Sequence, residues 1–475
     1  MGRKGLFVKL IIAIAMLFLS IYFARVIIKL NILPTNLIII LYGALISLNM
    51  IADLCLFLKG KWIKIVTVIL DAILIFVSVI GINYGNSTKN FLNKAFDNNK
   101  YEITTYDVIV LNDSEVKNLN ELKSSTLGYF SEDSNVSEML AAINKKVVTD
   151  NQKYNDVYEL YNALINKKVV SIVLDDSFID TIKDEDKDID KKTKIIYTFE
   201  IKKDKNKKEE PVKEENYNKP INILLSGSDS RTTKIYSKSR SDVNMIVTIN
   251  PKTKEVLLTS IPRDYYVPIY GKGGAKDKLT HAGIYGLDVS VGTVEELFGI
   301  EIDYSIKVGF QSVVKLVDII GGIDIDSDRA FTSSSMPTWK VKKGTNHLDG
   351  KKALAYSRER YAYGTGDNHR IQNQQQIMTA VGEKLTSSTK LLTNYTGILE
   401  ALSDLYITDI PSEWITNIVK ETLSGGSWTF KSQVVSGTNS MVTTYTSPNS
   451  KRSVVIPDDN TVKIAAKKIK EVIEG

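Results

Sequence analysis

Three long apolar runs occupy the first 83 residues of the chain and predict membrane-spanning helices. The runs cover residues 6–24, 37–58 and 65–82. Each is close to the roughly 17–25 residues that a helix needs to cross the hydrocarbon layer of a membrane. A cleaved signal peptide would explain the first run alone. We therefore expect a multi-pass membrane protein, with residues 1–83 forming three transmembrane helices.

The charges that flank these runs predict how the chain is oriented. Arg3 and Lys4 precede the first run, and Lys59, Lys61 and Lys64 separate the second from the third. Cytoplasmic loops are enriched in Lys and Arg, so the N-terminus and this loop are expected inside. An odd number of spans then places the residues after about 83 outside the cell membrane.

Beyond the spans, residues 84–201 show a weaker pattern of strands and helices. A polar stalk is expected to about residue 100. Residues 101–111 alternate like a strand, 138–147 and 156–168 have helical spacing, and 169–174 form a short apolar strand. We interpret 84–201 as a small α/β accessory domain. Residues 202–220 hold seven lysines and five acids and read as a charged linker, because they cannot fill a core.

Residues 221–475 have a denser alternation of strands and helices. Strands are predicted at 221–227, 243–250, 254–261, 302–310 and 429–435, and helices at 291–300, at 311–320, from about 367, through most of 389–424, and at 460–474. Such alternation predicts an α/β fold, an α/β/α sandwich built on a mixed central sheet.

Arginine is concentrated in two short regions of this last segment. The chain has ten arginines among 61 Lys and Arg residues. Six of the ten lie in these regions: Arg231, Arg240, Arg263, Arg358, Arg360 and Arg370. The planar guanidinium grips a phosphate or carboxylate through two bonds at once, which lysine cannot do. Surface Arg–Asp pairs are the alternative, but each stabilises by only about 0–1 kcal/mol. The clustering favours recognition of a diphosphate.

Two aspartates flank the predicted strands of the same segment. Asp229 follows the strand at 221–227, and Asp242 precedes the strand at 243–250. Strands joined by short links are usually neighbours. Asp229, Asp242 and Arg263 should therefore meet at one end of the sheet. Two carboxylates beside a diphosphate suit Mg²⁺, with Mn²⁺ as the alternative ion.

Other chemistries find little support in the sequence. The single cysteine, Cys55, lies in the second apolar run, which excludes disulfides and thiol catalysis in the outer region. His281, His347 and His369 lack metal-ligand spacing. No phosphate-binding glycine loop or Gly-x-Ser-x-Gly turn is present. The net charge of +6 is dispersed, so no nucleic-acid partner is expected.

At this point several motifs resemble one family. They are "NILLSGSDSR", "RSDVNMIVTINPKTKEVLLTSIPRDYYV", "DKLTHAGIYG", "VGFQSVVKLVDIIGGIDID" and "HLDGKKALAYSRERYAYGTGDNHRIQNQQQ". In this order, over about residues 220–385, they resemble the LytR-CpsA-Psr (LCP) family. The three spans and the accessory domain resemble its capsule-associated, CpsA-type members. The resemblance implies that 221–475 is an LCP catalytic domain, which transfers a glycopolymer from a polyprenyl-pyrophosphate carrier to a muramyl hydroxyl of peptidoglycan.

The resemblance also implies roles for individual residues. Asp229 and Asp242 match the Mg²⁺-associated aspartates, and Asp242 is our choice for the proton acceptor. Asp242, Arg263, Arg358 and Arg360 are expected to be catalytic. The residues expected to bind substrate are Arg231, Arg240, Lys278, Asp367, Arg370 and Gln374. The chain differs from many members at Asn373, where an arginine is frequent, and at Thr280, where an asparagine is common.

Substrate and partners follow from the same resemblance. The polymer is expected to be capsular polysaccharide or another secondary polymer such as teichoic acid, and capsule-synthesis proteins are candidate partners. Met245, Val247, Val308 and the helix "SVVKLVDII" could line a slot for the polyprenyl chain, or could simply be core. Two alternatives remain at this point, a non-catalytic binder of lipid-linked glycans and a membrane-bound regulator of capsule or cell-wall synthesis.

Overall fold

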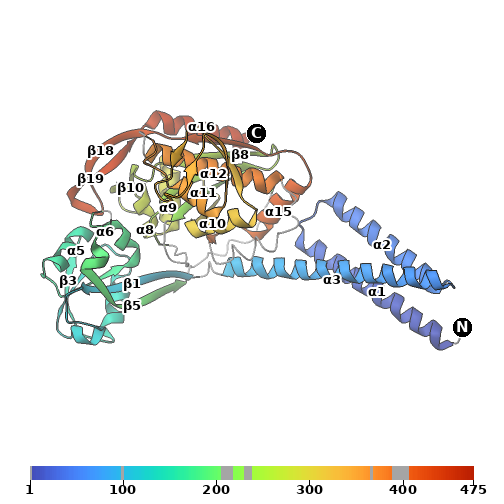
Figure 1. Ribbon diagram of the computed structural model, residues 1–475. Helices are drawn as coiled ribbons and strands as arrows, with labels where there is room; N and C mark the ends of the chain where they lie inside the picture. The colour runs from blue at the N-terminus through green and yellow to red at the C-terminus, as the bar shows by residue number, and fades with distance from the viewer. Residues whose placement is uncertain are drawn as a thin grey trace.

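Three long helices extend from one side of an α/β body in the computed structural model (Figure 1). The structure describes residues 3–97, 101–183, 185–204, 218–228, 238–363, 367–387 and 406–475. The helices are α1 (Arg3–Leu30), α2 (Thr35–Phe57) and α3 (Lys61–Asp97). All three are long and apolar enough to cross a membrane, in agreement with the three predicted spans. Helix α3 continues without a break past residue 83, so the expected stalk is helical as far as Asp97.

Helices α1 and α3 pack closely near the α/β body. Side chains added at Gly81 and Gly85 of α3 would overlap Phe23 and Val26 of α1. Glycine at these positions lets the two backbones approach, as small residues commonly do between membrane helices. The last turns of α1 therefore lie beside α3 at the level of Gly85.

The accessory region contains a five-stranded sheet with strand order β3-β2-β4-β1-β5. Its strands are β1 (Tyr101–Leu111), β2 (Thr126–Phe130), β3 (Asp150–Tyr154), β4 (Ser171–Asp175) and β5 (Thr193–Asp204). Its helices are α4 (Val136–Asn144), α5 (Val157–Ile165), α6 (Ile179–Lys183) and α7 (Ile189–Lys192). The sequence predicted β1, β4, α4 and α5 but not the other strands. Strand β5 also continues past residue 201, into the first residues of the expected linker.

Asp175, at the end of β4, carries a pH-dependent part of the stability of this region. Its side chain accepts hydrogen bonds from Ser177 N at 2.9 Å and Ser177 Oγ at 2.7 Å. Burial first, and then the charge of Asp133, raise its pKa to about 7, while the Ser177 hydrogen bonds and Lys238 oppose the shift. A carboxyl with a raised pKa in the folded state stabilises the protein at low pH. That contribution is lost as the pH rises through the folded pKa.

We therefore expect the melting temperature of the full chain to fall between about pH 4 and pH 7, and Asp175→Asn to flatten this slope. Asparagine keeps the oxygen that accepts from Ser177 but cannot ionise. Each unit of pKa difference corresponds to about 1.4 kcal/mol. Thermal unfolding in detergent at several pH values measures the slope. Asp188→Asn, an exposed change in the same region, serves as control. Equal slopes in wild type and Asp175→Asn would contradict the expectation.

A six-stranded mixed sheet forms the centre of the C-terminal region, with strand order β16-β11-β6-β7-β8-β17. Its strands are β6 (Ile221–Ser228), β7 (Val243–Asn250), β8 (Glu255–Ile261), β11 (Tyr304–Gly309), β16 (Tyr406–Thr408) and β17 (Thr429–Val434). Strand β7 is antiparallel to β6 and β8, whereas β11 is parallel to β6 and β17 to β8. The start of β7 and the ends of β6 and β8 thus lie at the same edge.

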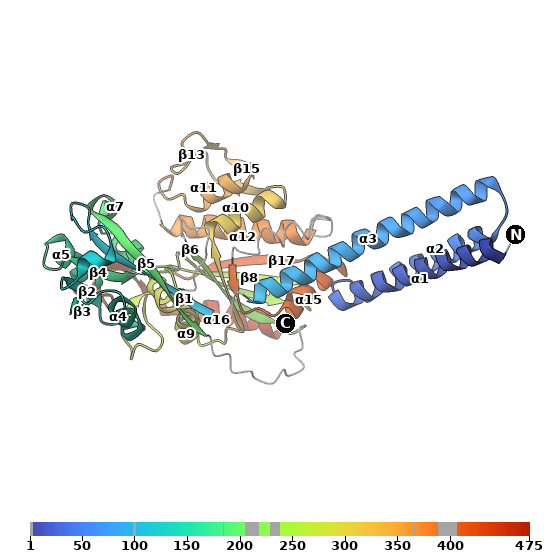
Figure 2. The ribbon, with the colours of Figure 1, turned by 90° about the horizontal axis from the view of Figure 1, so that it is seen from below.

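Helices cover both faces of this sheet (Figure 2). One face packs on α8 (Leu279–Tyr285), α9 (Leu287–Phe298) and α16 (Asp459–Glu474). The other is covered by α10 (Phe310–Ile319), α11 (Gly350–Ser357), α12 (Asp367–Ser387) and α15 (Ser412–Leu423). Leu224 and Ile246 point to the first face, and Leu225 and Met245 to the second, as the two-residue period of strands requires. The predicted α/β/α sandwich with a mixed sheet is confirmed.

Short strands border the sandwich. They are β9 (Tyr266–Pro268), β10 (Lys276–Lys278), β12 (Ile323–Ser327), β13 (Phe331–Thr332), β14 (Lys340–Val341) and β15 (Gly344–Leu348). A longer antiparallel hairpin, β18 (Gly437–Thr444) and β19 (Ser447–Pro457), was not predicted. In Figure 1 this hairpin reaches from the C-terminal region to the accessory region.

The accessory and C-terminal regions share side-chain contacts. Ile284 and Tyr285, at the end of α8, belong to the accessory core cluster that includes Phe178. The hairpin adds polar contacts: Tyr445 Oη donates to Glu132 at 2.9 Å, and Arg452 Nη1 lies 2.5 Å from Glu185 Oε1. The Arg452 guanidinium also lies 3.8 Å from the centre of the Tyr158 ring. These contacts fix the accessory region against α8 and the hairpin.

Candidate functional site

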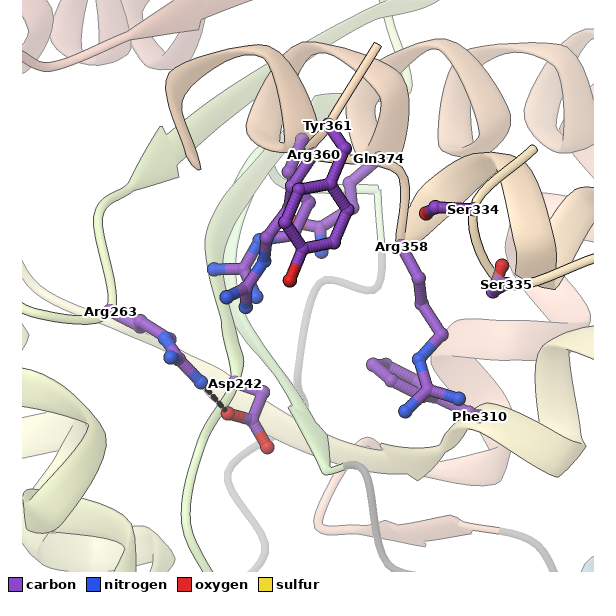
Figure 3. Close-up of a pocket in the computed structure, with 10 residues that line it drawn as sticks. Asp242, Arg263, Phe310, Ser334, Ser335, Arg358, Arg360, Tyr361 and Gln374 are labelled. Atoms are coloured by element: carbon purple, nitrogen blue, oxygen red, sulfur yellow. Dashed lines mark hydrogen bonds and ion pairs between the residues drawn. The ribbon is translucent and has the colours of Figure 1, made fainter. Parts of the chain in front are cut away.

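A cavity of about 400 Å³ opens at the end of the central sheet where β7 begins and β8 ends (Figure 3). Asp242 immediately precedes β7, and Arg263 lies two residues after β8. The cavity is lined by Asp242, Arg263, Phe310, Ser334, Ser335, Arg358, Arg360, Tyr361, Arg370 and Gln374. Six of these ten were predicted site residues. The structure thus brings together residues that lie more than a hundred positions apart in the chain.

Asp242 and Arg263 form an ion pair on one wall of the cavity. Arg263 Nη1 lies 2.6 Å from Asp242 Oδ1, and both side chains are mostly buried. Burial alone would raise the pKa of Asp242. The charges of Arg240, Arg263 and Arg370 outweigh that effect and hold the pKa below its usual value. The carboxylate is therefore anionic at neutral pH. Its position confirms the expectation that Asp242 and Arg263 emerge at one end of the sheet.

Arg358 and Arg360 are presented by a turn that is organised around Glu359. Glu359 is fully buried, and its carboxylate accepts hydrogen bonds from the backbone N–H of Arg360, Tyr361 and Ala362 at 2.9–3.2 Å and from Ser334 N at 2.7 Å. Burial raises the pKa of Glu359, but these hydrogen bonds lower it below its usual value. With Glu359 turned inward, the arginines on either side of it line the cavity, and Arg358 lies 5.5 Å from the centre of the Phe310 ring.

Helix α12 supplies Arg370 and Gln374 from one helical face. Both side chains are mostly buried and line the cavity. A spacing of four residues puts them on adjacent turns. Asn373 is also buried but does not line the cavity, and its Nδ2 donates to the backbone oxygen of Tyr356 at 3.1 Å. Asn373 therefore links α12 to α11 by a hydrogen bond.

Two predicted substrate-binding residues, Arg240 and Lys278, do not line the cavity but lie close to its charges. Arg240 Nη1 donates to the backbone oxygen of Asp180, in the accessory region, at 2.9 Å. Lys278 Nζ lies 3.3 Å from Asp264 Oδ1, and Asp264 Oδ2 lies 3.6 Å from Arg263 Nε. Their direct contact with a substrate remains a prediction.

Three further predicted residues cannot be placed. Asp229 and Arg231 lie outside the described residues, and so does the side chain of Asp367, whose backbone begins α12. Among the residues that the structure describes, no group of three or more His, Cys, Asp or Glu side chains is arranged to hold a metal ion. Asp242 is the described member of the predicted metal pair.

Lys307 was missed by sequence reasoning. It lies in the middle of β11, is fully buried, and its Nζ donates to the backbone oxygen of Ser239 at 2.8 Å. Burial lowers its pKa to about 7, against the opposing effect of Asp242. This hydrogen bond holds Ser239, three residues before Asp242, against strand β11. A lysine within the predicted strand "SIKVG" was the only signal that could have identified it.

Gly283 in α8 leaves room for the segment 239–241, which immediately precedes Asp242, to lie against this helix. A Cβ at this position would overlap Ser241 Oγ and Ser239 O, and Ser239 N donates to Gly283 O at 3.0 Å. The last residues before Asp242 therefore lie directly against α8.

We expect Gly283→Ala to displace this segment, to destabilise the protein by about 1–3 kcal/mol, and to weaken the Asp242–Arg263 pair. Thermal unfolding and the activity assay described below measure the two effects. Gly43→Ala is the matched control, because a Cβ there meets nothing within 4 Å. Wild-type behaviour of Gly283→Ala would show that the segment can move aside without consequence.

One protein-family model covers all the residues that line the cavity. The LytR_cpsA_psr family model matches residues 188–455, which is more than half of the chain. A second model, for a DNA polymerase processivity factor, matches residues 60–174. That range begins just before α3 and so includes an apolar helix that could cross a membrane.

Several proteins that are similar to the chain carry related names. "Polyisoprenyl-teichoic acid--peptidoglycan teichoic acid transferase TagU" of Bacillus mycoides (strain KBAB4) is 37% identical over 202 residues, covering 42% of this chain and 64% of that protein. The protein of the same name from Bacillus cereus (strain ATCC 14579) is 35% identical over 221 residues, 46% of this chain and 70% of that protein. The crystal structure of B. subtilis TagV is 30% identical, with a TM-score of 0.46 over 54% of this chain and 98% of that chain. The chain thus spans slightly less than two thirds of the first relative.

Proposed function

Because this chain belongs to the LytR-CpsA-Psr family, we propose that it transfers a cell-wall glycopolymer from a polyprenyl-pyrophosphate carrier to peptidoglycan. The observation that carries the proposal is the lining of one cavity by four arginines, Arg263, Arg358, Arg360 and Arg370. Guanidinium groups bind phosphate oxygens in pairs, and a diphosphate offers enough oxygens for several of them. The names of the relatives support a polyisoprenyl-linked donor and a peptidoglycan acceptor.

The proposed reaction is a phosphoryl transfer. The oxygen of a peptidoglycan hydroxyl attacks the phosphorus that carries the glycan. The bond from this phosphorus to the bridging oxygen breaks, and polyprenyl phosphate leaves with the bonding electrons. In such reactions the protein mainly positions the reactants and stabilises charge. The four cavity arginines would bind the diphosphate and neutralise the negative charge that develops on the leaving phosphate.

Asp242 is the proposed acceptor of the hydroxyl proton. Among the described residues that line the cavity, it is the only carboxylate. Its low pKa keeps it ionised and ready to accept a proton, although it also makes the carboxylate a weaker base. The Arg263 pair holds the carboxylate in place against the cavity.

We propose that a Mg²⁺ ion binds beside Asp242. Mg²⁺ commonly binds through one or two carboxylates together with substrate phosphate oxygens. Asp242 would supply one carboxylate, and Asp229 is the predicted second. When bound, the ion would add positive charge beside the diphosphate. Mn²⁺ has the same preference for oxygen ligands and is the alternative.

The polyprenyl chain requires an apolar surface beside the cavity. Met245, Val247 and Val308 lie on the sheet face that α12 covers, where Met245 is buried and the two valines are partly buried. We propose that the polyprenyl chain lies along this face of the sheet. Val317 and Ile320, from the segment 312–320 that is the other predicted lining, pack instead with α11 and α12 in a separate cluster.

The location of the reaction follows from the spans. With the N-terminus in the cytoplasm, the α/β body would face the cell wall, where peptidoglycan lies. The polymer would be a teichoic acid, as the names of the relatives suggest, or a capsular polysaccharide, and in the second case capsule-synthesis proteins would be partners.

Reconstitution tests the proposal. The full chain in detergent, with a lipid-linked glycan donor, peptidoglycan fragments and Mg²⁺, should form a phosphodiester-linked product and release polyprenyl phosphate. Donor binding without product, at any concentration of metal ion or acceptor, would instead identify a non-catalytic binder of lipid-linked glycans.

A further inference from the structure

A second cavity lies where the spans meet the C-terminal region. Its volume is about 650 Å³. Helices α1 and α3 form one wall, and the first turns of α15 form the other. The lining residues are Tyr22, Arg25, Val26, Lys29, Leu30, Asn31, Gly85, Asn86, Lys89, Ser412, Glu413 and Thr416. It shares no residue with the cavity that contains Asp242.

The depth of this cavity in the membrane follows from the length of α3. The apolar run of α3 ends at Ile82, and a run of 18 residues spans about 27 Å, close to the thickness of the hydrocarbon layer. Gly85 and Lys89 therefore lie at or just beyond the level of the lipid headgroups. Val26 of α1 contacts α3 at Gly85, which puts Arg25 and Lys29 at the same level.

The charges of the lining favour an anion. Arg25, Lys29 and Lys89 face one carboxylate, Glu413, and none of the three has an ion pair recorded within the described part of the chain. All three cations are exposed. Tyr22, Val26 and Leu30 add apolar side-chain surface to the same cavity. Cations beside apolar side chains at headgroup depth match a phosphate group joined to hydrocarbon chains.

We propose that this cavity binds the phosphate headgroup of an anionic phospholipid between the spans and α15. The phosphate lies among Arg25, Lys29 and Lys89, and the acyl chains run down the apolar side of α1. A lipid in this position joins the membrane helices to the C-terminal region. The proposal is independent of the transferase activity, since it uses none of the residues of the first cavity.

Lipid retention tests this site. The full chain is placed in nanodiscs of phosphatidylcholine with a minor fraction of phosphatidylglycerol, released, and examined by native mass spectrometry for bound lipid. We expect phosphatidylglycerol to be enriched over phosphatidylcholine, and the enrichment to fall at least tenfold in the triple variant Arg25→Gln, Lys29→Gln, Lys89→Gln. The charge-conserving variant Arg25→Lys, Lys29→Arg, Lys89→Arg should retain it.

A matched control lies at the opposite end of the same helices. Lys59, Lys61 and Lys64 are also exposed cations beside the spans but are far from α15. The triple change of these lysines to glutamine should leave the enrichment unchanged. Equal loss in both triple variants, or equal retention of the two lipids by wild type, would overturn the proposal. Displacement of the lipid by millimolar inorganic phosphate would also overturn it, and would point to a site for free phosphate.

Should the triple variant misfold, the single change Lys89→Gln, on the exposed surface of α3, provides the same test. It should lower the enrichment by several-fold, and an unchanged value would again argue against the site. Circular dichroism of each variant confirms that the helices remain folded.

Discussion

Glycopolymer transfer should fall by about 10³-fold in an Asp242→Asn variant, because one change removes the proposed proton acceptor, a proposed metal ligand and the partner of Arg263. Asparagine has nearly the same shape, so the cavity remains. Arg263, which is mostly buried, loses its anionic partner at 2.6 Å. The initial rate of product formation measures the effect.

Two comparisons separate these roles of Asp242. Asp324→Asn is the control, because Asp324 is exposed and pairs with exposed His347 across the β12–β15 ladder. Donor binding should survive in Asp242→Asn, since four arginines remain. If the metal ion matters, chelation should reduce wild-type transfer toward the level of the variant. A wild-type rate in Asp242→Asn would remove this residue from the mechanism.

Arg358→Lys and Arg360→Lys should each lower transfer by about 10²–10³-fold while preserving the net charge of the cavity. Lysine carries a compact charge and cannot make the paired hydrogen bonds of a guanidinium. Both arginines flank the buried Glu359, so their backbone should keep its position. The expected loss therefore reports the geometry of phosphate binding. The rate and the donor affinity should be measured separately.

The control for these variants is Arg329→Lys. Arg329 is half exposed, lies over the ring of Tyr363, and does not line the cavity. We expect it to transfer at close to the wild-type rate. Near-normal transfer by both Arg358→Lys and Arg360→Lys would show that charge alone suffices at these positions.

Much of the central sheet could be predicted, because strands that are consecutive in the sequence pair with one another. Strands β6, β7 and β8 follow one another along the chain, β7 and β8 through a link of only four residues, and all three are rich in apolar residues. Antiparallel pairing of β7 with β8 then required Asp242 and Arg263 to share an edge, and their ion pair confirms it. The grouping of Arg358, Arg360 and Arg370 with them came from residue type and family resemblance, because no local pattern connects segments so far apart.

Residues whose role depends on distant contacts could not be predicted. In the sequence Glu359 is simply an acid between two arginines, yet it is fully buried and accepts hydrogen bonds from four backbone N–H groups. Lys307 is a single lysine within a strand, and nothing in the neighbouring residues indicates that it is fully buried. The β18–β19 hairpin has mostly exposed side chains, so it lacks the apolar alternation that marks a strand.

The shared cluster around α8 links the folding of two regions that the sequence separates by a charged segment. Ile284 and Tyr285 lie in the core of the accessory region, while α8 itself packs on the central sheet. Opening either region would therefore expose apolar surface of the other. Their unfolding free energies are coupled, and the coupling acts through the helix whose Gly283 lies against the residues before Asp242. A ligand that binds and stabilises the folded accessory region would, by this linkage, also stabilise the folded C-terminal region.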